Sequence, residues 1–112
     1  MLAKKFRLPI QEFYRKSSQN TRTKYFTLKI FKPEKSYARL GIVVSKKVAS
    51  KASGRNSLRR LIFNFARDNY QRLVVNDYLI ILLPVSAKVS KDDLITALEY
   101  ALKTKTNPRL NV

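Results

Sequence analysis

The chain has 112 residues, the size of one ordinary domain, and hydrophobic residues make up 45% of it, enough to build a core. Its 24 Lys and Arg residues against 7 Asp and Glu residues give a formal net charge of +17, which indicates a polyanionic partner, foremost nucleic acid. Cysteine and histidine are both absent, which excludes disulfides, zinc sites of the usual Cys/His kind and imidazole general-base catalysis.

An anionic membrane surface is the rival partner for so basic a chain. The sequence contains no apolar run near the ~20 residues that span a bilayer. Its first residues also lack the apolar stretch of a secretory signal. We therefore expect a cytoplasmic protein without a membrane partner.

The N-terminal part is predicted to contain a basic arm and a short helix. Residues 1–8 carry Lys4, Lys5 and Arg7 and are expected to form a flexible arm. Pro9 suits the first turn of a helix, which predicts a helix over residues 11–18. The polar residues 17–22 are predicted to form turns.

Two strands are predicted next. Residues 25–31 alternate between two faces, which is typical of a strand. One face holds Phe26, Leu28 and Ile30, and the outward face holds Tyr25, Thr27, Lys29 and Phe31. Residues 39–45 form a second strand that is apolar enough to be central in a sheet.

A basic loop over residues 46–54 leads into a long helix predicted over residues 55–73. Its apolar side chains fall on one side at 100° per residue, namely Leu58, Leu61, Ile62 and Phe65. A third buried strand is predicted over residues 78–83.

A last amphipathic helix is predicted to follow Ser90, which fits the N-cap of a capping box. Asp92 and Asp93 then lie in the first turn, where the helix dipole favours negative charge. This position accounts for the acidic pair better than a metal site does. The element order α-β-β-α-β-α predicts a single RNA-binding domain over residues 1–112, an α/β sandwich with a parallel crossover between the second and third strands.

The basic loop and the long helix together predict a surface for RNA phosphates. Small residues in the loop let the backbone approach a phosphate, and the helix N-terminus adds free N–H groups. The helix cations lack acidic partners four residues away, whereas a purely solvated helix usually interleaves charges of both signs. The polar residues concerned are Lys46, Lys47 and Lys51 in the loop and Arg55, Asn56, Arg59, Arg60 and Arg67 on the helix.

Two positions stay open at this stage. Phe63 falls among the helix cations and either stacks on a base or an arginine or packs into a small core. The outward face of strand 25–31 is either core, covered by the first helix with Phe13 or Tyr14, or a stacking platform for single-stranded nucleic acid.

The strand, loop and helix resemble the protein subunit of bacterial ribonuclease P. The motif residues are Ser45-Lys46-Lys47-Val48, then Arg55-Asn56-Ser57 and Arg59-Arg60-Leu61-Ile62, after a strand ending GIVV. The resemblance covers nearly the whole chain, including Arg7-Leu8 with Phe13 and Tyr14, the strand YFTLKIF, and DYLIIL before the last helix. This chain departs from the pattern at Ser57 and Phe63, where the family has arginine.

The resemblance implies an α+β fold, an α-β sandwich of about four mixed strands and three helices. It implies ribosomal-protein-S5-domain-2-like topology with an unusual left-handed βαβ crossover. The fourth strand then lies within residues assigned above to turns or loops.

The resemblance also implies a non-catalytic protein that helps a catalytic RNA to remove the 5′ leader of precursor tRNA. The RNA requires Mg²⁺, and the protein binds no cofactor firmly, has no catalytic or metal-binding residue, and acts as a monomer in a 1:1 complex. The residues expected to face the catalytic RNA are Lys46, Lys47, Lys51, Arg55, Asn56, Arg59, Arg60 and Arg67. The residues expected to bind the leader, in a cleft between the first helix and the sheet, are Phe13, Tyr14, Tyr25, Lys29 and Phe31.

Two other functions compete with this one. A structural RNA-binding module of the ribosomal-protein kind has the same charge and size. A protein-only nuclease requires clustered carboxylates, whereas the seven acidic residues are dispersed along the sequence.

Overall fold

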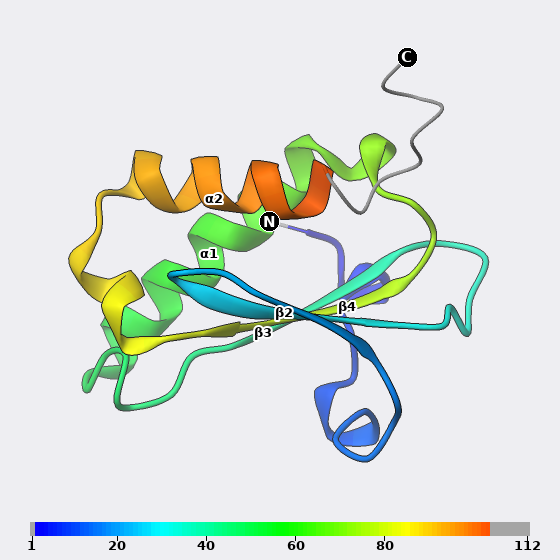
Figure 1. Cartoon of the computed structure of the whole chain (residues 1–112), viewed down its shortest axis with the longest axis horizontal. Coiled ribbons are helices and arrows are strands. Elements are labelled where there is room, and N and C mark those ends of the chain that lie inside the picture. The colour runs from blue at the N-terminus through cyan, green and yellow to red at the C-terminus, as the bar shows by residue number, and fades with distance from the viewer. Residues whose placement is uncertain (1, 104–112) are drawn as a thin grey trace.

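Two α-helices cover one face of a four-stranded sheet in the computed structural model, which describes residues 2–103 (Figure 1). The strands are β1 (Gln19–Arg22), β2 (Phe26–Phe31), β3 (Arg39–Val43) and β4 (Asp77–Leu82). The helices are α1 (Ala52–Asp68) and α2 (Lys91–Lys103). Short 3₁₀ helices are η1 (Lys4–Phe6), η2 (Ile10–Glu12), η3 (Tyr70–Arg72) and η4 (Pro84–Lys88).

The sheet has the strand order β1-β2-β4-β3 and is mixed. β1–β2 and β2–β4 are antiparallel, and β3–β4 is parallel, so the predicted crossover through α1 is confirmed. The fourth strand is β1, which lies in the stretch predicted to form turns. Its residues QNTR show no apolar alternation, and the strand forms because its backbone pairs with β2 at the edge of the sheet.

The two long helices match the prediction with shifted ends. α1 begins at Ala52 and ends at Asp68, where the Asn69 side chain donates to the Phe65 carbonyl at 2.9 Å. α2 is capped as predicted, since the backbone N–H of Asp93 donates to Ser90 Oγ at 3.1 Å. Within residues 2–103, neither helix combines the length and apolar character that a membrane span requires.

The predicted helix over residues 11–18 is wrong. Only the 3₁₀ helix η2 and a following turn form there, so the described chain has two α-helices instead of three. The segment presents one buried apolar side chain, Phe13, while Tyr14 is 70% exposed. A helix needs a repeating apolar stripe to gain from packing, and this stretch has none.

The main core lies between the sheet and the two helices. Alternate residues of the strands point into it from below, and one side of each helix packs from above. Fully or nearly fully buried members are Phe26, Leu28, Leu40, Ile42, Ile62, Ile80, Leu94 and Leu98.

The N-terminal segment packs against the domain, so the expectation of a flexible arm is wrong for residues 2–8. Leu2 and Leu8 are 3% and 6% exposed, and the Leu8 N–H donates to the Leu40 carbonyl at 2.9 Å. The segment pairs with the edge strand β3 at one parallel bridge, Arg7 with Leu40, and η2 then lies on the sheet face opposite the helices (Figure 1). Burial of these two leucine side chains stabilises the docked position of the segment despite its positive charge.

A smaller apolar cluster lies on that opposite face. It is formed by Leu8, Phe13, Phe31 and Leu79, with Ile10 packed against it. Gly41 of β3 lies beneath this cluster, and a Cβ atom there would meet Ile10 Cγ1 at 2.9 Å and Leu8 Cβ at 3.1 Å. The N-terminal segment approaches the sheet this closely because position 41 has no side chain.

We predict that Gly41→Ala destabilises the fold by about 1–3 kcal/mol, because the new methyl group overpacks the contact with Leu8 and Ile10. Gly54→Ala is the matched control: in α1 the helix propensity of Ala offsets one tight contact, 3.2 Å to Ala49 Cβ. Urea unfolding midpoints measure both effects. Equal midpoints for the two variants would contradict the close approach at Gly41.

Candidate nucleic-acid interface

The predicted cationic surface exists, and it is formed by the loop after β3 and by the first turns of α1. Lys46, Lys47 and Lys51 are exposed, and Lys51 is the N-cap residue of α1. Its side chain makes no capping hydrogen bond. The N-terminal turn of α1 therefore joins free N–H groups and a positive dipole end to exposed ammonium groups, a combination that suits phosphate.

Arg55 shapes the loop. Its Nη1 donates to the carbonyls of Ala49 and Ser50 at 3.0 and 2.8 Å, so the side chain is half-buried and holds the loop against the helix. Gly54 permits the same close packing, since a Cβ there would lie 3.2 Å from Ala49 Cβ. Part of the expected RNA-binding capacity of Arg55 is thus used to order the loop.

The remaining helix cations differ in how they are held. Arg59 Nη1 donates to Asn56 Oδ1 at 3.0 Å, which orients both side chains along one face. Arg60 is exposed. Arg67 pairs with Asp68 at 3.1 Å, and both of these side chains are more than half exposed, so the pair adds little stability.

Phe63, which the sequence left open, is packed and stacks on an arginine. Its ring is 8% exposed and belongs to the main core cluster. The guanidinium carbon of Arg7 lies 5.2 Å from the ring centroid, within the range of a cation–π interaction. The partner arginine comes from the N-terminal segment.

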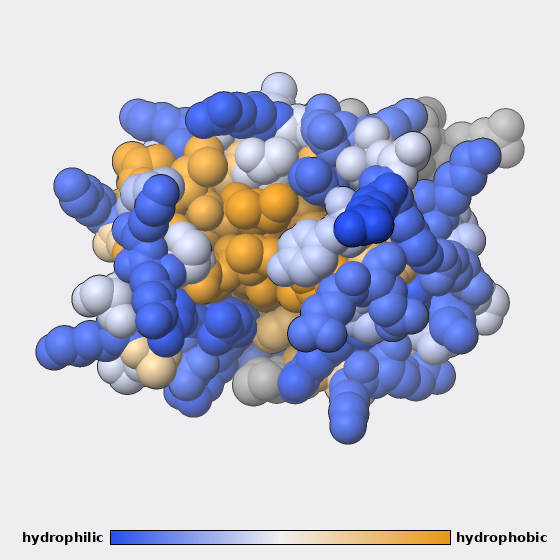
Figure 2. All heavy atoms as spheres, turned by 90° about the horizontal axis from the view of Figure 1, so that it is seen from below, coloured by the Kyte–Doolittle hydropathy of each residue, from blue (hydrophilic) through white to orange (hydrophobic). Residues whose placement is uncertain are grey.

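The second candidate surface is the sheet face opposite the helices. Residues paired across strands point to the same face, so the strand registers define rows of side chains there. One row is Arg22, Thr27, Ile81 and Val43, and the next is Asn20, Lys29, Leu79 and Gly41. Figure 2 shows this face as an apolar surface framed by hydrophilic side chains, and Ile10, Val43 and Ile81 are its partly exposed apolar members.

The five residues that the sequence resemblance assigns to leader binding differ in their exposure and position in the structure. Phe13 and Phe31 are 2% and 3% exposed and contact each other edge to face at 5.0 Å, so neither ring presents a face to a base. These two residues form the covered end of the face, because η2 closes over them. Lys29 is half-buried on this face and Tyr14, which follows η2, is exposed, whereas Tyr25 packs against the main core.

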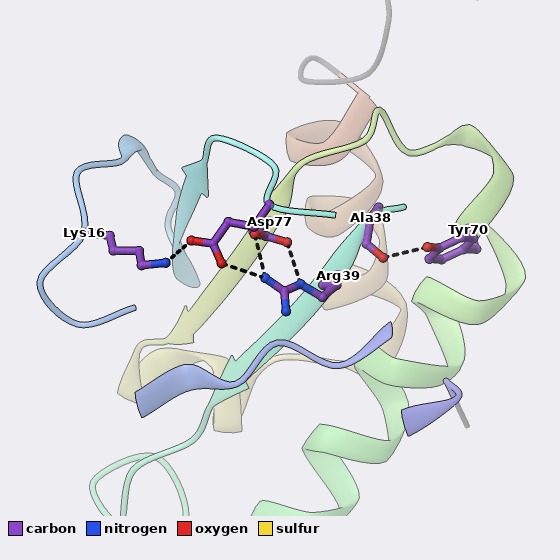
Figure 3. A network of polar contacts seen from close by, with 6 residues as sticks. Lys16, Ala38, Arg39, Tyr70 and Asp77 are labelled. Carbon is purple, nitrogen blue, oxygen red and sulfur yellow. Dashed lines mark hydrogen bonds and ion pairs between the residues drawn. The ribbon is translucent and has the colours of Figure 1, made fainter. Parts of the chain in front are cut away.

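A buried ion pair supports this covered end, and sequence reasoning missed it. Arg39 Nε and Nη2 donate to the two Asp77 carboxylate oxygens, each at 2.9 Å (Figure 3). Asp77 is fully buried and Arg39 is 7% exposed. The two residues are directly paired in the parallel β3–β4 register. The available signal was a charged residue at the start of one predicted strand, Arg39, and one directly before the next, Asp77.

The pair extends toward η2 through side chains on both sides of Phe13. Glu34 accepts from Lys16 and lies 3.5 Å from Arg39, and the hydrogen bond from Lys16 holds the pKa of the Glu34 carboxyl below its ordinary value. Lys16 Nζ and the Arg39 guanidinium carbon lie 4.2 and 5.5 Å from the Phe13 ring centroid. Two cations therefore hold the ring that closes this end of the face.

The start of β3 is also held from the side of α1. The Tyr70 hydroxyl donates to the Ala38 carbonyl at 2.6 Å (Figure 3), and burial raises the pKa of Tyr70 above its ordinary value. Among the residues that the structure describes, no group of three or more His, Cys, Asp or Glu side chains is arranged to hold a metal ion. The arrangement is suited to binding a polyanion by phosphate and apolar contacts.

Comparisons with a family model and with a curated protein sequence agree on one family. Residues 5–106 match the family model described as Ribonuclease P. The Ribonuclease P protein component of Baumannia cicadellinicola subsp. Homalodisca coagulata is 36% identical over 63 residues, which are 56% of this chain and 55% of that protein. The match thus spans about half the length of this curated relative.

Solved structures of the same kind share the fold. The RNase P protein from Thermotoga maritima superimposes with a TM-score of 0.79 at 26% identity, covering 90% of this chain and 98% of that one. The RNase P protein of Staphylococcus aureus superimposes with a TM-score of 0.81 at 23% identity, covering 91% and 98% of the two chains.

We predict that Arg39→Met destabilises the fold by about 3–5 kcal/mol, because it leaves the Asp77 carboxylate buried without its partner. Lys16→Met is the matched control: it breaks an exposed ion pair of the same network and is expected to cost less than about 1 kcal/mol. Chemical denaturation of both variants measures the difference. Similar losses of unfolding free energy for the two variants would show that the buried pair contributes no more to stability than the exposed one.

Proposed function

The chain belongs to the ribonuclease P protein family, and from this premise we propose that it is the non-catalytic protein component of a ribonucleoprotein that removes the 5′ leader of precursor tRNA. The catalytic RNA is its main partner in this proposal, in a 1:1 complex, and precursor tRNA is the second. The observation that carries the proposal is the presence of two different surfaces suited to RNA on one small domain.

The first surface suits the phosphates of a structured RNA. It combines the exposed lysines of the loop and the N-terminus of α1 with helix arginines, of which Arg55 and Arg59 are held in place by hydrogen bonds within the protein. Arginine forks bind phosphate oxygens in a bidentate manner, and fixed side chains lose less entropy on binding. We assign this surface to the catalytic RNA.

The second surface suits a single strand. Its open part combines apolar Val43 and Ile81 with Arg22 and Lys29, which the strand register places on the same face. Single-stranded nucleic acids bind where bases find an apolar or aromatic floor and phosphates find nearby cations. We assign this part to the leader, with exposed Tyr14 as its stacking residue and buried Phe13 and Phe31 as its support.

In this division of labour the RNA supplies the reacting groups and holds the Mg²⁺ ions. The protein has neither histidine nor cysteine. Asp77 is committed to Arg39, and Asp92 and Asp93 lie in the first turn of α2. The function of the chain is then to bind and orient two RNA molecules relative to each other.

Reconstitution tests the proposal. The protein is mixed with the catalytic RNA of the same organism and a precursor tRNA at low Mg²⁺, and cleavage rate and precursor affinity are measured with and without it. We expect both to rise when the protein is present. Binding to the RNA without any effect on cleavage or precursor affinity would instead favour a structural RNA-binding module.

We predict that Arg59→Ala with Arg60→Ala weakens binding to the catalytic RNA and flattens its salt dependence. Each lost phosphate contact lowers the slope of log affinity against log salt by roughly one unit. Lys32→Ala with Lys35→Ala is the control, since it removes the same charge from exposed residues of the β2–β3 turn. If the two double variants have the same slope, net charge accounts for binding and α1 has no particular role.

We predict that Tyr14→Ala weakens binding of precursor tRNA by at least about fivefold, because stacking of a base on an aromatic ring contributes ~1–3 kcal/mol. Affinity for mature tRNA, which lacks the leader, is expected to stay unchanged. Tyr100→Ala is the matched control, because Tyr100 is 73% exposed on α2, across the sheet from η2. Equal losses for precursor and mature tRNA would remove Tyr14 from the leader site.

A further inference from the structure

We propose that Arg7 is an additional RNA-contacting residue of the α1 surface and that Phe63 holds it there. The inference rests on the proposed function, because it concerns the same RNA-binding surface. It adds a residue from the N-terminal segment to a surface that otherwise belongs to the loop and α1.

Phe63 interrupts a line of cations along α1. Residues four apart in a helix lie nearly above one another, so Arg59, Phe63 and Arg67 form one row. At ~1.5 Å rise per residue, the outer two are about 12 Å apart along the axis, with Phe63 midway between them. A row of arginines at this spacing would present one guanidinium per helical turn, and Phe63 leaves the middle turn without one.

Arg7 places a guanidinium at that middle position. Its guanidinium carbon lies 5.2 Å from the Phe63 ring centroid. Phe63 is 8% exposed, and the guanidinium lies over one face of its ring. The missing cation of the row is thus supplied by a different segment of the chain, 56 residues earlier in the sequence.

The placement of Arg7 is fixed by its backbone and by one of its side-chain nitrogens. The residue forms a parallel bridge with Leu40 of the edge strand β3, and the next residue, Leu8, donates to the Leu40 carbonyl at 2.9 Å. Arg7 Nε donates to the Leu2 carbonyl at 3.1 Å. The buried side chains of Leu2 and Leu8 anchor the segment on both sides.

These contacts leave the two terminal nitrogens of Arg7 for a ligand. Within residues 2–103, they make no hydrogen bond, and no carboxylate lies within ion-pair distance of Arg7. A half-buried guanidinium that is stacked on a ring and fixed through Nε keeps its outer edge for bidentate binding of phosphate. Its preorganisation lowers the entropy lost when RNA binds.

The competing interpretation is that Arg7 only fastens the N-terminal segment to α1. A structural fastener changes stability but leaves the number of phosphate contacts unchanged. The salt dependence of RNA binding therefore separates the two roles, because its slope counts those contacts.

The experiment measures affinity of the full chain for the catalytic RNA across a KCl series, with urea midpoints recorded for every variant. We expect Arg7→Gln to lower the log–log slope by about one unit and to weaken binding roughly fivefold at ~0.15 M salt. Phe63→Leu keeps an apolar side chain but removes the ring, and is expected to weaken binding roughly two- to threefold. In the Arg7→Gln background it is expected to cause no further loss.

A rescue variant tests the position of the contact, and its urea midpoint shows whether the fold tolerates the substitution at the buried position 63. Phe63→Arg combined with Arg7→Gln restores a cation at the middle of the row and is expected to recover the wild-type slope. Lys5→Gln is the matched control, because Lys5 belongs to the same segment but lies over the rings of Phe6 and Tyr37, at 5.1 and 4.8 Å. Its slope is expected to equal that of the wild type.

A wild-type slope for Arg7→Gln, together with a reduced slope for the Arg59 and Arg60 double variant, would overturn this inference alone. Wild-type slopes for both would overturn it together with the assignment of α1 to RNA. A reduced slope for the rescue variant at the same urea midpoint as Arg7→Gln, while Arg7→Gln lowers the slope, would overturn the position of the contact on the α1 row.

Discussion

Asp77 is a carboxylate with no exposure to solvent, at the start of a central strand, and burial of such a charge is very unfavourable unless it is paired. Arg39, directly beside it in the parallel register, satisfies both carboxylate oxygens. The pair therefore requires β3 and β4 to be in this register. It also presents a guanidinium against Phe13, and with Lys16 and Glu34 it determines where η2 closes over the sheet.

The N-terminal segment acts on both sides of the domain. It covers the edge of β3, seals one end of the open sheet face with Leu8 and Phe13, and carries Arg7 to the α1 surface. The absence of a side chain at Gly41 allows the close crossing that links these contacts. The two proposed RNA surfaces are consequently joined through one stretch of chain. Although the net charge of the protein is +17, the fold fixes the positions of some of its cationic side chains, Arg7 and Arg39 among them.

Much of the fold follows from local patterns. β2, β3, β4 and the two α-helices were predictable because their apolar residues repeat at the period of a strand or a helix. β1 was not, since an edge strand of polar residues gains its stability from pairing with β2. The helix predicted over residues 11–18 failed for a related reason: a single buried ring, Phe13, is held by tertiary contacts that need no helix.

The sequence by itself determined the charge, the helix that carries the arginines and the alternation that separates the two faces of β2, because each depends on residues close together in the chain. Only the tertiary structure decided which distant side chains meet. Arg39 with Asp77, Phe13 with Phe31 and Arg7 with Phe63 join segments whose relative positions depend on strand register and on the crossing at Gly41. Because of these pairings, the rings of Phe13 and Phe31, both candidates for leader binding, are buried in the protein. Arg7, which was expected to lie in a flexible arm, is instead fixed against α1, because burial and stacking depend on the neighbours that folding supplies.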